Sequence, residues 1–292
     1  MSRDLRRRTL IAATLGLVAA CAPPAPRQLV SLSPTTSPPT PPSTAVSTTT
    51  VSITARPTQP PLPDRAATVA AYRDARPTAF GLTVPGVVTR LTEPVVALTF
   101  DACGGPGGHR YDQALITTLR DLRVPATLFL NSRWIDANPA AARDLAADPL
   151  FDIGNHGTRH LPLTVTGRAA YGIHGTRDAG EVYDEIATNH AKLTALVGRA
   201  PAFFRSGTAH YDDVATRIVN DLGEQVIGFD INADAGARHS PGQVQHAMTA
   251  VRPGSIVIAH LNNPTGGTAR GMAVALPNLL ADGIRFTHLP RP

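Results

Sequence analysis

The chain has 292 residues and a formal net charge of +5, and 17% of its residues are charged. Residues 1–20 hold four arginines and one aspartate, so the remainder of the chain carries only about +2. This balance excludes the strongly basic surface expected of a nucleic-acid-binding protein, and the length allows one folded domain of ordinary size.

The N-terminus has the plan of an export signal. Arg6-Arg7-Arg8 precedes an apolar stretch, residues 9–20, that is too short to cross a bilayer. That stretch ends in Leu17-Val-Ala-Ala-Cys21, which resembles the lipobox of bacterial lipoproteins. We therefore expect residues 1–20 to be a signal peptide and Cys21 to be lipidated, with an ordinary signal and a chance cysteine as the alternative. Arg7-Arg8 also resembles a twin-arginine motif, which leaves the export route open.

Residues 21–63 are rich in proline, serine and threonine and nearly lack large apolar side chains. Such a segment cannot bury enough surface to offset its chain entropy, so we expect a disordered linker that spaces the domain from a membrane or simply connects to it. Residues 64–92 are expected to form a structured lead-in, and residues 93–292 one domain. Lipidation of Cys21 would leave Cys103 as the only free cysteine, so an intrachain disulfide is not expected.

Short apolar runs alternate with helical segments through this domain. The expected strands are residues 95–100, 124–130, 150–155, 202–204, 226–229, 255–259 and 283–289. The expected helices are residues 111–122, 140–147, 179–197, 212–222 and 241–251. Alternation of this kind predicts an α/β fold with a mainly parallel sheet. We expect a distorted or incomplete (β/α)7 TIM-like barrel, with an open doubly wound sheet as the alternative.

Five of the expected strands run directly into a residue that can carry charge. These residues are Asp101, His156, Arg205, Asp230 and His260, and His160 and Asp234 follow four residues after two of them. In strand/helix barrels the chemistry lies where strands end, so we expect one assembled site. Each residue also has an ordinary structural role as its alternative, such as a loop cap, a backbone-bonded histidine or a buried ion pair. The glycine-rich residues 104–108 lack the lysine of a phosphate-binding loop, and we interpret them as a flexible loop beside the site.

These residues, in this order, resemble the motifs of the polysaccharide deacetylase family, carbohydrate esterase family 4, over residues 94–289. The family's Thr-Phe-Asp-Asp motif is similar to Thr99-Phe100-Asp101-Ala102, and its His-Ser/Thr-x-x-His motif to His156–His160 with the threonine displaced by one. Its Arg-x-Pro motif is similar to Arg205-Ser206-Gly207, and its Leu-x-His motif to Ile258-Ala259-His260. Phe229–Asp234 takes the place of the aspartate-rich fourth motif without its tryptophan.

The resemblance implies a divalent metal ion, expected to be zinc, held by His156 and His160. We expect the two imidazoles, four residues apart on a helical turn, to face one ion. The family's second aspartate is a further ligand, and Ala102 cannot replace it. Three alternatives stay open: water, substrate or a remote carboxylate completes the site, Cys103 reaches it, or metal binding is lost. If the missing aspartate alone weakens binding, Ala102→Asp should tighten it.

The same resemblance implies the acid–base groups of a hydrolysis. Asp101 is the implied general base, and Arg205 the cation that keeps it ionised. His260 is the implied general acid that protonates the leaving group. Asp234 or Asp230 would orient His260, and the sequence leaves that choice open.

We therefore expect a secreted, lipid-anchored, metal-dependent deacetylase. Its substrate would be an N-acetylated or O-acetylated polysaccharide of the cell wall or surface, such as peptidoglycan. A non-catalytic glycan-binding lipoprotein on the same fold and an amidohydrolase of small amides are the alternatives, because a fold does not fix a substrate. We expect a monomer that faces the cell wall or periplasm, contacts the membrane only through its lipid anchor and binds no nucleic acid.

Overall fold

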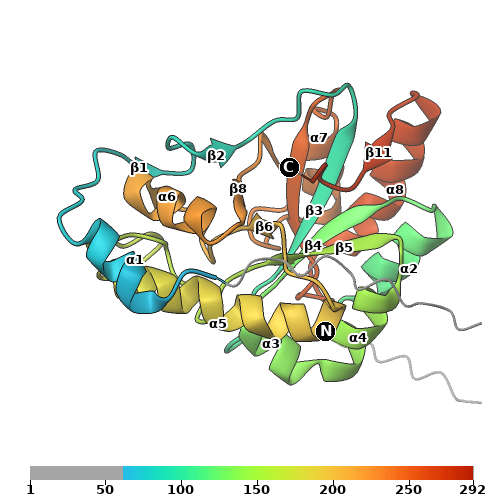
Figure 1. Cartoon of the computed structure of the whole chain (residues 1–292). Coiled ribbons are helices and arrows are strands. Elements are labelled where there is room, and N and C mark those ends of the chain that lie inside the picture. The colour runs from blue at the N-terminus through green and yellow to red at the C-terminus, as the bar shows by residue number, and fades with distance from the viewer. Residues whose placement is uncertain (1–61, 292) are drawn as a thin grey trace, which may run out of the picture. The chain divides into compact units, whose positions relative to one another are not determined.

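A computed structural model describes residues 62–291 of the chain (Figure 1). The expected signal peptide, the lipidation site Cys21 and nearly all of the expected linker lie outside these residues. Within the described part of the chain, every helix is too short or too polar to cross a bilayer.

The centre of the domain is a parallel sheet. Its strands are β2 (Val87–Val88), β3 (Val96–Ala102), β4 (Ala126–Leu130), β5 (Phe151–Asn155), β6 (Phe203–Phe204), β8 (Gln225–Ile227), β9 (Ile231–Asn232), β10 (Ile256–His260) and β11 (Phe286–Thr287). The spatial order is β2-β8-β6-β5-β4-β3-β10-β9, with β11 paired to β3, and every pairing in it is parallel. All seven expected strands are present, and most are shorter than their apolar runs.

The strand order shows that the sheet curls on itself. β8 ends at Ile227 and β9 begins at Ile231, yet these neighbours in sequence lie near opposite ends of the strand order. The short connection between them forces the two ends of the sheet to approach each other. The predicted incomplete (β/α)7 barrel is thereby confirmed, and the open doubly wound sheet is excluded.

The alternating residues of β3 face two different cores. Ala97 packs inside the curled sheet with residues such as Phe129 and Phe203. Phe100 and Ala102 belong instead to the apolar cluster between the sheet and its helices. Because side chains alternate along a strand, this arrangement aims Asp101 into the barrel and Ala102 away from it.

Helices cover the outside of the sheet (Figure 1). The five expected helices are present as α2 (Gln113–Asp121), α4 (Pro139–Ala147), α5 (Ala179–Val197), α6 (Asp213–Asp221) and α7 (Pro241–Met248). α5 stops at Gly198, whose positive φ of 73° and N–H bond to the Thr194 carbonyl close the helix as expected.

Three helices were not predicted from the sequence: α1 (Arg65–Tyr72), α3 (Ser132–Ala137) and α8 (Thr268–Ala281). α8 contains Gly271 and Pro277, two residues that disfavour helix interiors. A Cβ at Gly271 would lie 2.4 Å from the Cβ of Val244 in α7, so glycine permits the two helices to pack closely. Packing against α7 and α2 therefore outweighs the poor helix propensity.

The lead-in segment folds against the domain. The Arg65 guanidinium at the start of α1 pairs with Asp184 on α5 at 2.8 Å, and the Tyr183 hydroxyl donates to the Pro63 carbonyl at 3.0 Å. β1 (Phe80–Gly81) pairs with β7 (Tyr211–Asp212), and β2 joins the main sheet beside β8. Residues before the motif-bearing region thus complete one edge of the barrel.

Candidate active site

A cleft of about 430 Å³ lies at the carboxyl edge of the parallel sheet. Asp101, Cys103, His160 and His260 line it together. Parallel strands bring their carboxyl ends to one edge, so residues that follow different strands meet there. The structure brings together the residues that the sequence suggested at strand ends, with Asp230 as the exception.

Arg205 fixes the orientation of Asp101. The guanidinium is fully buried, and its Nη1 donates to Asp101 Oδ1 at 2.9 Å and to the Thr99 hydroxyl at 2.8 Å. Its Nε and Nη2 donate to the carbonyls of Ile227 and Gly228 at 3.1 and 2.9 Å. The arginine therefore cannot turn without breaking bonds to two other strands, and Asp101 is held by a rigid cation.

The electrostatics favour an ionised Asp101. Burial alone would raise the pKa of this carboxyl, but the neighbouring His156 and Arg205 outweigh burial and hold its pKa below the ordinary value. Oδ1 is occupied by Arg205, whereas Oδ2 lies 3.6 Å from His156 Nε2. A carboxylate oxygen therefore remains available toward the cleft.

His260 is held by Asp234. Asp234 Oδ1 lies 2.9 Å from His260 Nδ1, and Oδ2 accepts the backbone N–H of His260 at 2.7 Å and the Thr268 hydroxyl at 2.9 Å. Burial would lower the pKa of His260, but the Asp234 carboxylate raises it well above the ordinary value. The pair thus favours an imidazolium directed at the cleft.

Asp230 belongs to a different network. Its carboxylate pairs with Arg90 and accepts the Ser255 hydroxyl at 3.1 Å and the Ile256 N–H at 2.9 Å. It does not line the cleft. The sequence left open whether Asp230 or Asp234 orients His260, and in the structure Asp234 contacts it.

His156 and His160 meet in space, but not on a helical turn. Their rings lie edge to face with centroids 4.9 Å apart. The segment between them is irregular, and His160 itself has a left-handed φ of 66°. The expectation of a helical turn is therefore wrong, because the apolar strand β5 ends at Asn155 and the chain turns sharply through Gly157 at φ 74°.

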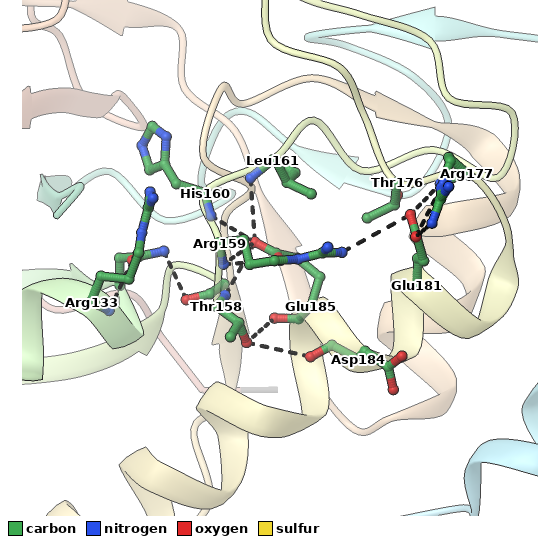
Figure 2. A network of polar contacts seen from close by, with 12 residues as sticks. Arg133, Thr158, Arg159, His160, Leu161, Thr176, Arg177, Glu181, Asp184 and Glu185 are labelled. Carbon is green, nitrogen blue, oxygen red and sulfur yellow. Dashed lines mark hydrogen bonds and ion pairs between the residues drawn. The ribbon is translucent and has the colours of Figure 1, made fainter. Parts of the chain in front are cut away.

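Glu185 holds this irregular segment in place (Figure 2). Its side chain is 1% exposed, and its Oε1 accepts backbone N–H groups of residues 158–161 at 2.8–3.3 Å. A Cβ at Gly157 would lie 2.6 Å from this oxygen, so glycine is needed for the close approach. Burial raises the pKa of Glu185, and the backbone donors counteract this only in part. In Figure 2 the His160 ring points away from the carboxylate, so Glu185 holds the backbone of this segment and does not contact the ring.

Sequence reasoning missed Glu185. A signal was present, since an acid stands on the buried side of α5 between Val182 and Ile186. A buried acid on an apolar helix face implies donors nearby. Which backbone would supply those donors was not readable from the sequence.

The Cys103 thiol and the two histidines form a group that fits a metal ion. One ligand atom from each of Cys103, His156 and His160 lies within 4.8 Å of the others, and Cys103 Sγ is 3.8 Å from His156 Nε2. Burial would raise the pKa of the thiol, but the neighbouring His160 and His156 hold it well below the ordinary value. Sulfur and imidazole nitrogen are the ligands that zinc prefers in proteins. The residues present therefore fit the divalent metal that the motifs imply.

Removing the Glu185 carboxylate should weaken metal binding by Cys103, His156 and His160, although Glu185 contacts the backbone near them and not their side chains. In Glu185→Gln the amide can accept only part of the four backbone N–H groups, and an unsatisfied buried donor costs about 1–3 kcal/mol. We expect lower stability to urea and an affinity for cobalt(II) reduced about 10- to 100-fold, as for other groups that orient metal ligands. Glu181→Gln, one turn earlier on the same helix, is the control, because Glu181 pairs with Arg177 and reaches this segment only through the half-exposed Arg159 side chain at 4.0 Å. Equal metal affinities in the two variants would show that Glu185 does not position His160.

Comparisons with known proteins agree with the fold and the motifs. The sequence profile of the polysaccharide deacetylase family matches residues 89–227. A chitooligosaccharide deacetylase of Rhizobium leguminosarum bv. trifolii is 28% identical, over 67% of this chain and 90% of that protein. Among solved structures, the peptidoglycan N-acetylglucosamine deacetylase Bc1960 has a TM-score of 0.59 at 22% identity, over 70% of this chain and 91% of the other.

A second solved structure with this fold is described as a pseudoenzyme. BA3943 of Bacillus anthracis, described as a pseudoenzyme of carbohydrate esterase family 4, has a TM-score of 0.59 at 21% identity, over 71% of this chain and 68% of the other. Similarity at this level establishes the fold of the present chain alone. Together with the strand-end motifs, the profile match over residues 89–227 supports a divergent member of the polysaccharide deacetylase family, carbohydrate esterase family 4.

Proposed function

We propose that this protein is a metal-dependent deacetylase of a cell-wall or surface polysaccharide such as peptidoglycan. One observation carries the proposal. Asp101 and His260 face a single cleft beside the metal group, and each is oriented by its own buried partner, Arg205 and Asp234. A cleft that only bound glycan would need neither of these two buried ion pairs.

The arrangement supports separate roles for the metal ligands, Asp101 and His260 in amide hydrolysis. A divalent metal held by His156 and His160 would polarise the acetyl carbonyl and acidify water. Asp101, kept ionised by Arg205, accepts the proton of the attacking water. His260 donates its proton to the nitrogen as the carbon–nitrogen bond breaks. The products are acetate and the free amine, and an acetyl ester would give acetate and an alcohol by the same steps.

The rim of the cleft suits a saccharide. Tyr171 is 74% exposed, lines the cleft, and stands edge-on to His210 with ring centroids 5.0 Å apart. Exposed aromatic rings offer the flat apolar surface on which sugar rings pack. Trp134, the only tryptophan, is fully buried and cannot serve this purpose. The named relatives that act on chitooligosaccharide and peptidoglycan support the same substrate class.

A non-catalytic glycan-binding protein is the second candidate. Ala102 stands where the family has a metal-binding aspartate, and a similar structure belongs to a pseudoenzyme. The two candidates differ in acetate release from chitooligosaccharide or peptidoglycan, measured together with the metal content of the purified full chain. We expect acetate release that depends on bound metal. Metal-loaded, folded protein that binds these glycans and releases no acetate would favour the binding protein.

Neutralising Asp234 should change the pH profile. The Asp234 carboxylate raises the pKa of His260, so Asp234→Asn lowers that pKa and depletes the imidazolium as pH rises. We expect the alkaline limb of the kcat profile to move to lower pH. Thr268→Val removes another partner of Asp234 without changing charge, and it should leave the limb nearly in place. An unchanged alkaline limb in Asp234→Asn would exclude His260 as the acid that this carboxylate tunes.

We further propose that the protein is an exported, monomeric lipoprotein anchored through Cys21. A diacylglycerol supplies two acyl chains, at about 0.8 kcal/mol per buried methylene, which is enough for stable anchoring. Cys21→Ala should therefore move the protein from the membrane fraction to the soluble fraction. Cys103→Ser, which changes the other cysteine, should stay with the membrane. If Cys21→Ala remains membrane-bound, the lipid anchor is not the means of attachment.

A further inference from the structure

We propose that Cys103 is the third protein ligand of the metal ion, so that a thiolate replaces the carboxylate used elsewhere in the family. This ligand set favours thiophilic ions such as zinc and cobalt over magnesium and manganese. The inference rests on the proposed metal dependence of the enzyme, and it adds the identity of a ligand that the family motifs do not supply.

Strand geometry explains why residue 103 can coordinate and residue 102 cannot. Ala102 is still in register with Leu130 of β4, is fully buried, and packs in the cluster between sheet and helices. Cys103 follows on the other side, lines the cleft with Asp101, and is partly exposed. A carboxylate at position 102 would enter the apolar core. Ala102→Asp is therefore not expected to tighten metal binding. The ligand lies one residue later, at Cys103.

The distances match a compact metal site. Cys103 Sγ lies 3.8 Å from His156 Nε2, and the three ligand atoms lie within 4.8 Å of one another. A tetrahedral zinc ion, with bonds of about 2.3 Å to sulfur and about 2.0 Å to nitrogen, holds such atoms about 3.5 Å apart. Small rotations of the Cys103, His156 and His160 side chains would therefore bring the three ligand atoms to bonding distance from one ion.

Each imidazole presents a nitrogen that can bind a metal ion. His156 Nδ1 lies 2.9 Å from the Arg205 carbonyl, so it carries the proton and leaves Nε2 with a free lone pair. His160 Nε2 is buried and has no hydrogen-bond partner within residues 62–291. A buried unpaired nitrogen is costly, and coordination of a metal satisfies it.

The chain beyond Cys103 holds the thiol at the cleft. Gly104 has a positive φ of 69°, and a Cβ there would lie 2.6 Å from the Trp134 backbone nitrogen. The chain therefore turns tightly against α3 directly after the cysteine, and only glycine fits. The expected loop beside the site is thus part of what positions the thiol.

Cobalt(II) spectroscopy tests the ligand directly. We would use the full-length Cys21→Ala chain, in which Cys103 is the only thiol. A sulfur-to-cobalt charge-transfer band in the near ultraviolet is expected on titration. Cys103→Ser should lose the band and bind cobalt about 100-fold more weakly, at the upper end of the loss expected when a metal site is disturbed. Cys103→Asp, which restores a carboxylate from the same position, should regain affinity without the band.

A second measurement avoids substitution of Cys103. Iodoacetamide should alkylate Cys103 in the metal-free chain, and zinc should protect it. Bound cobalt with no charge-transfer band, or equal alkylation with and without zinc, would overturn the thiolate ligand. If acetate is still released when the band is missing or the alkylation is equal, the protein is a deacetylase whose metal has no thiolate ligand. A charge-transfer band without acetate release would keep the ligand and reject the deacetylase.

Discussion

Asp101→Asn is expected to lower acetate release by about 100-fold or more while the domain stays folded. The amide oxygen can still accept the Arg205 Nη1 hydrogen bond, which is 2.9 Å long in the parent, so the side chain keeps its place although the buried arginine loses its counter-ion and stability falls. What is lost is a group that can take the proton of the attacking water, and such a loss typically costs 10²–10⁴-fold. Steady-state acetate release from chitooligosaccharide, normalised to bound metal, measures it.

Asp230→Asn is the matched control for this substitution. Asp230 is likewise a carboxylate paired with an arginine, Arg90, but it lies outside the cleft. Its amide variant should lose stability rather than turnover per folded molecule. If Asp101→Asn keeps near-parental turnover on substrates that the parent hydrolyses, Asp101 is not the base.

Arg205→Met should destabilise the fold more than any surface substitution. The guanidinium is fully buried, donates to Asp101, Thr99 and two carbonyls, and lies 4.3 Å above the Phe129 ring. Breaking a buried ion pair by removing one partner typically costs about 3–5 kcal/mol, because the other charge is left uncompensated. Urea unfolding at neutral pH measures the loss.

The stability lost in Arg205→Met should become smaller as the pH falls. In the parent, Asp101 has a lowered pKa, so its ionised form stabilises the fold above about pH 4 and this contribution fades as pH falls. Without Arg205 the Asp101 pKa rises, and protonation relieves the uncompensated charge. The difference in unfolding free energy between parent and variant should therefore shrink as the pH is lowered toward 4.

Arg199→Met provides the comparison for Arg205→Met. Arg199 pairs with Asp152 at 2.8 Å, but its side chain is 42% exposed and Asp152 keeps Arg291 as a second partner. Exposed pairs contribute about 0–1 kcal/mol, so this variant should unfold nearly as the parent does. Equal losses in the two variants would contradict a special role for the buried arginine.

The local sequence determined the strands, their direction and the edge where the chemistry lies. Parallel strands buried on both faces read as continuous apolar runs, so β3, β4, β5 and β10 were visible without any long-range information. The end of α5 was visible because Gly198 alone could adopt its left-handed turn without strain. The polar residue after each strand then located the site, since parallel strands share one carboxyl edge.

Only the tertiary structure decided what these residues face. The pleat of β3, set by its pairing with β4, buries Ala102 and turns Cys103 into the cleft, although motif comparison pointed to residue 102. The left-handed backbone of His160 depends on a carboxylate 25 residues away, on Glu185. α8 forms despite Pro277 because its apolar side packs on α7 and α2. In each case the deciding free energy comes from contacts between segments distant in sequence, and local propensity contains no information about such contacts.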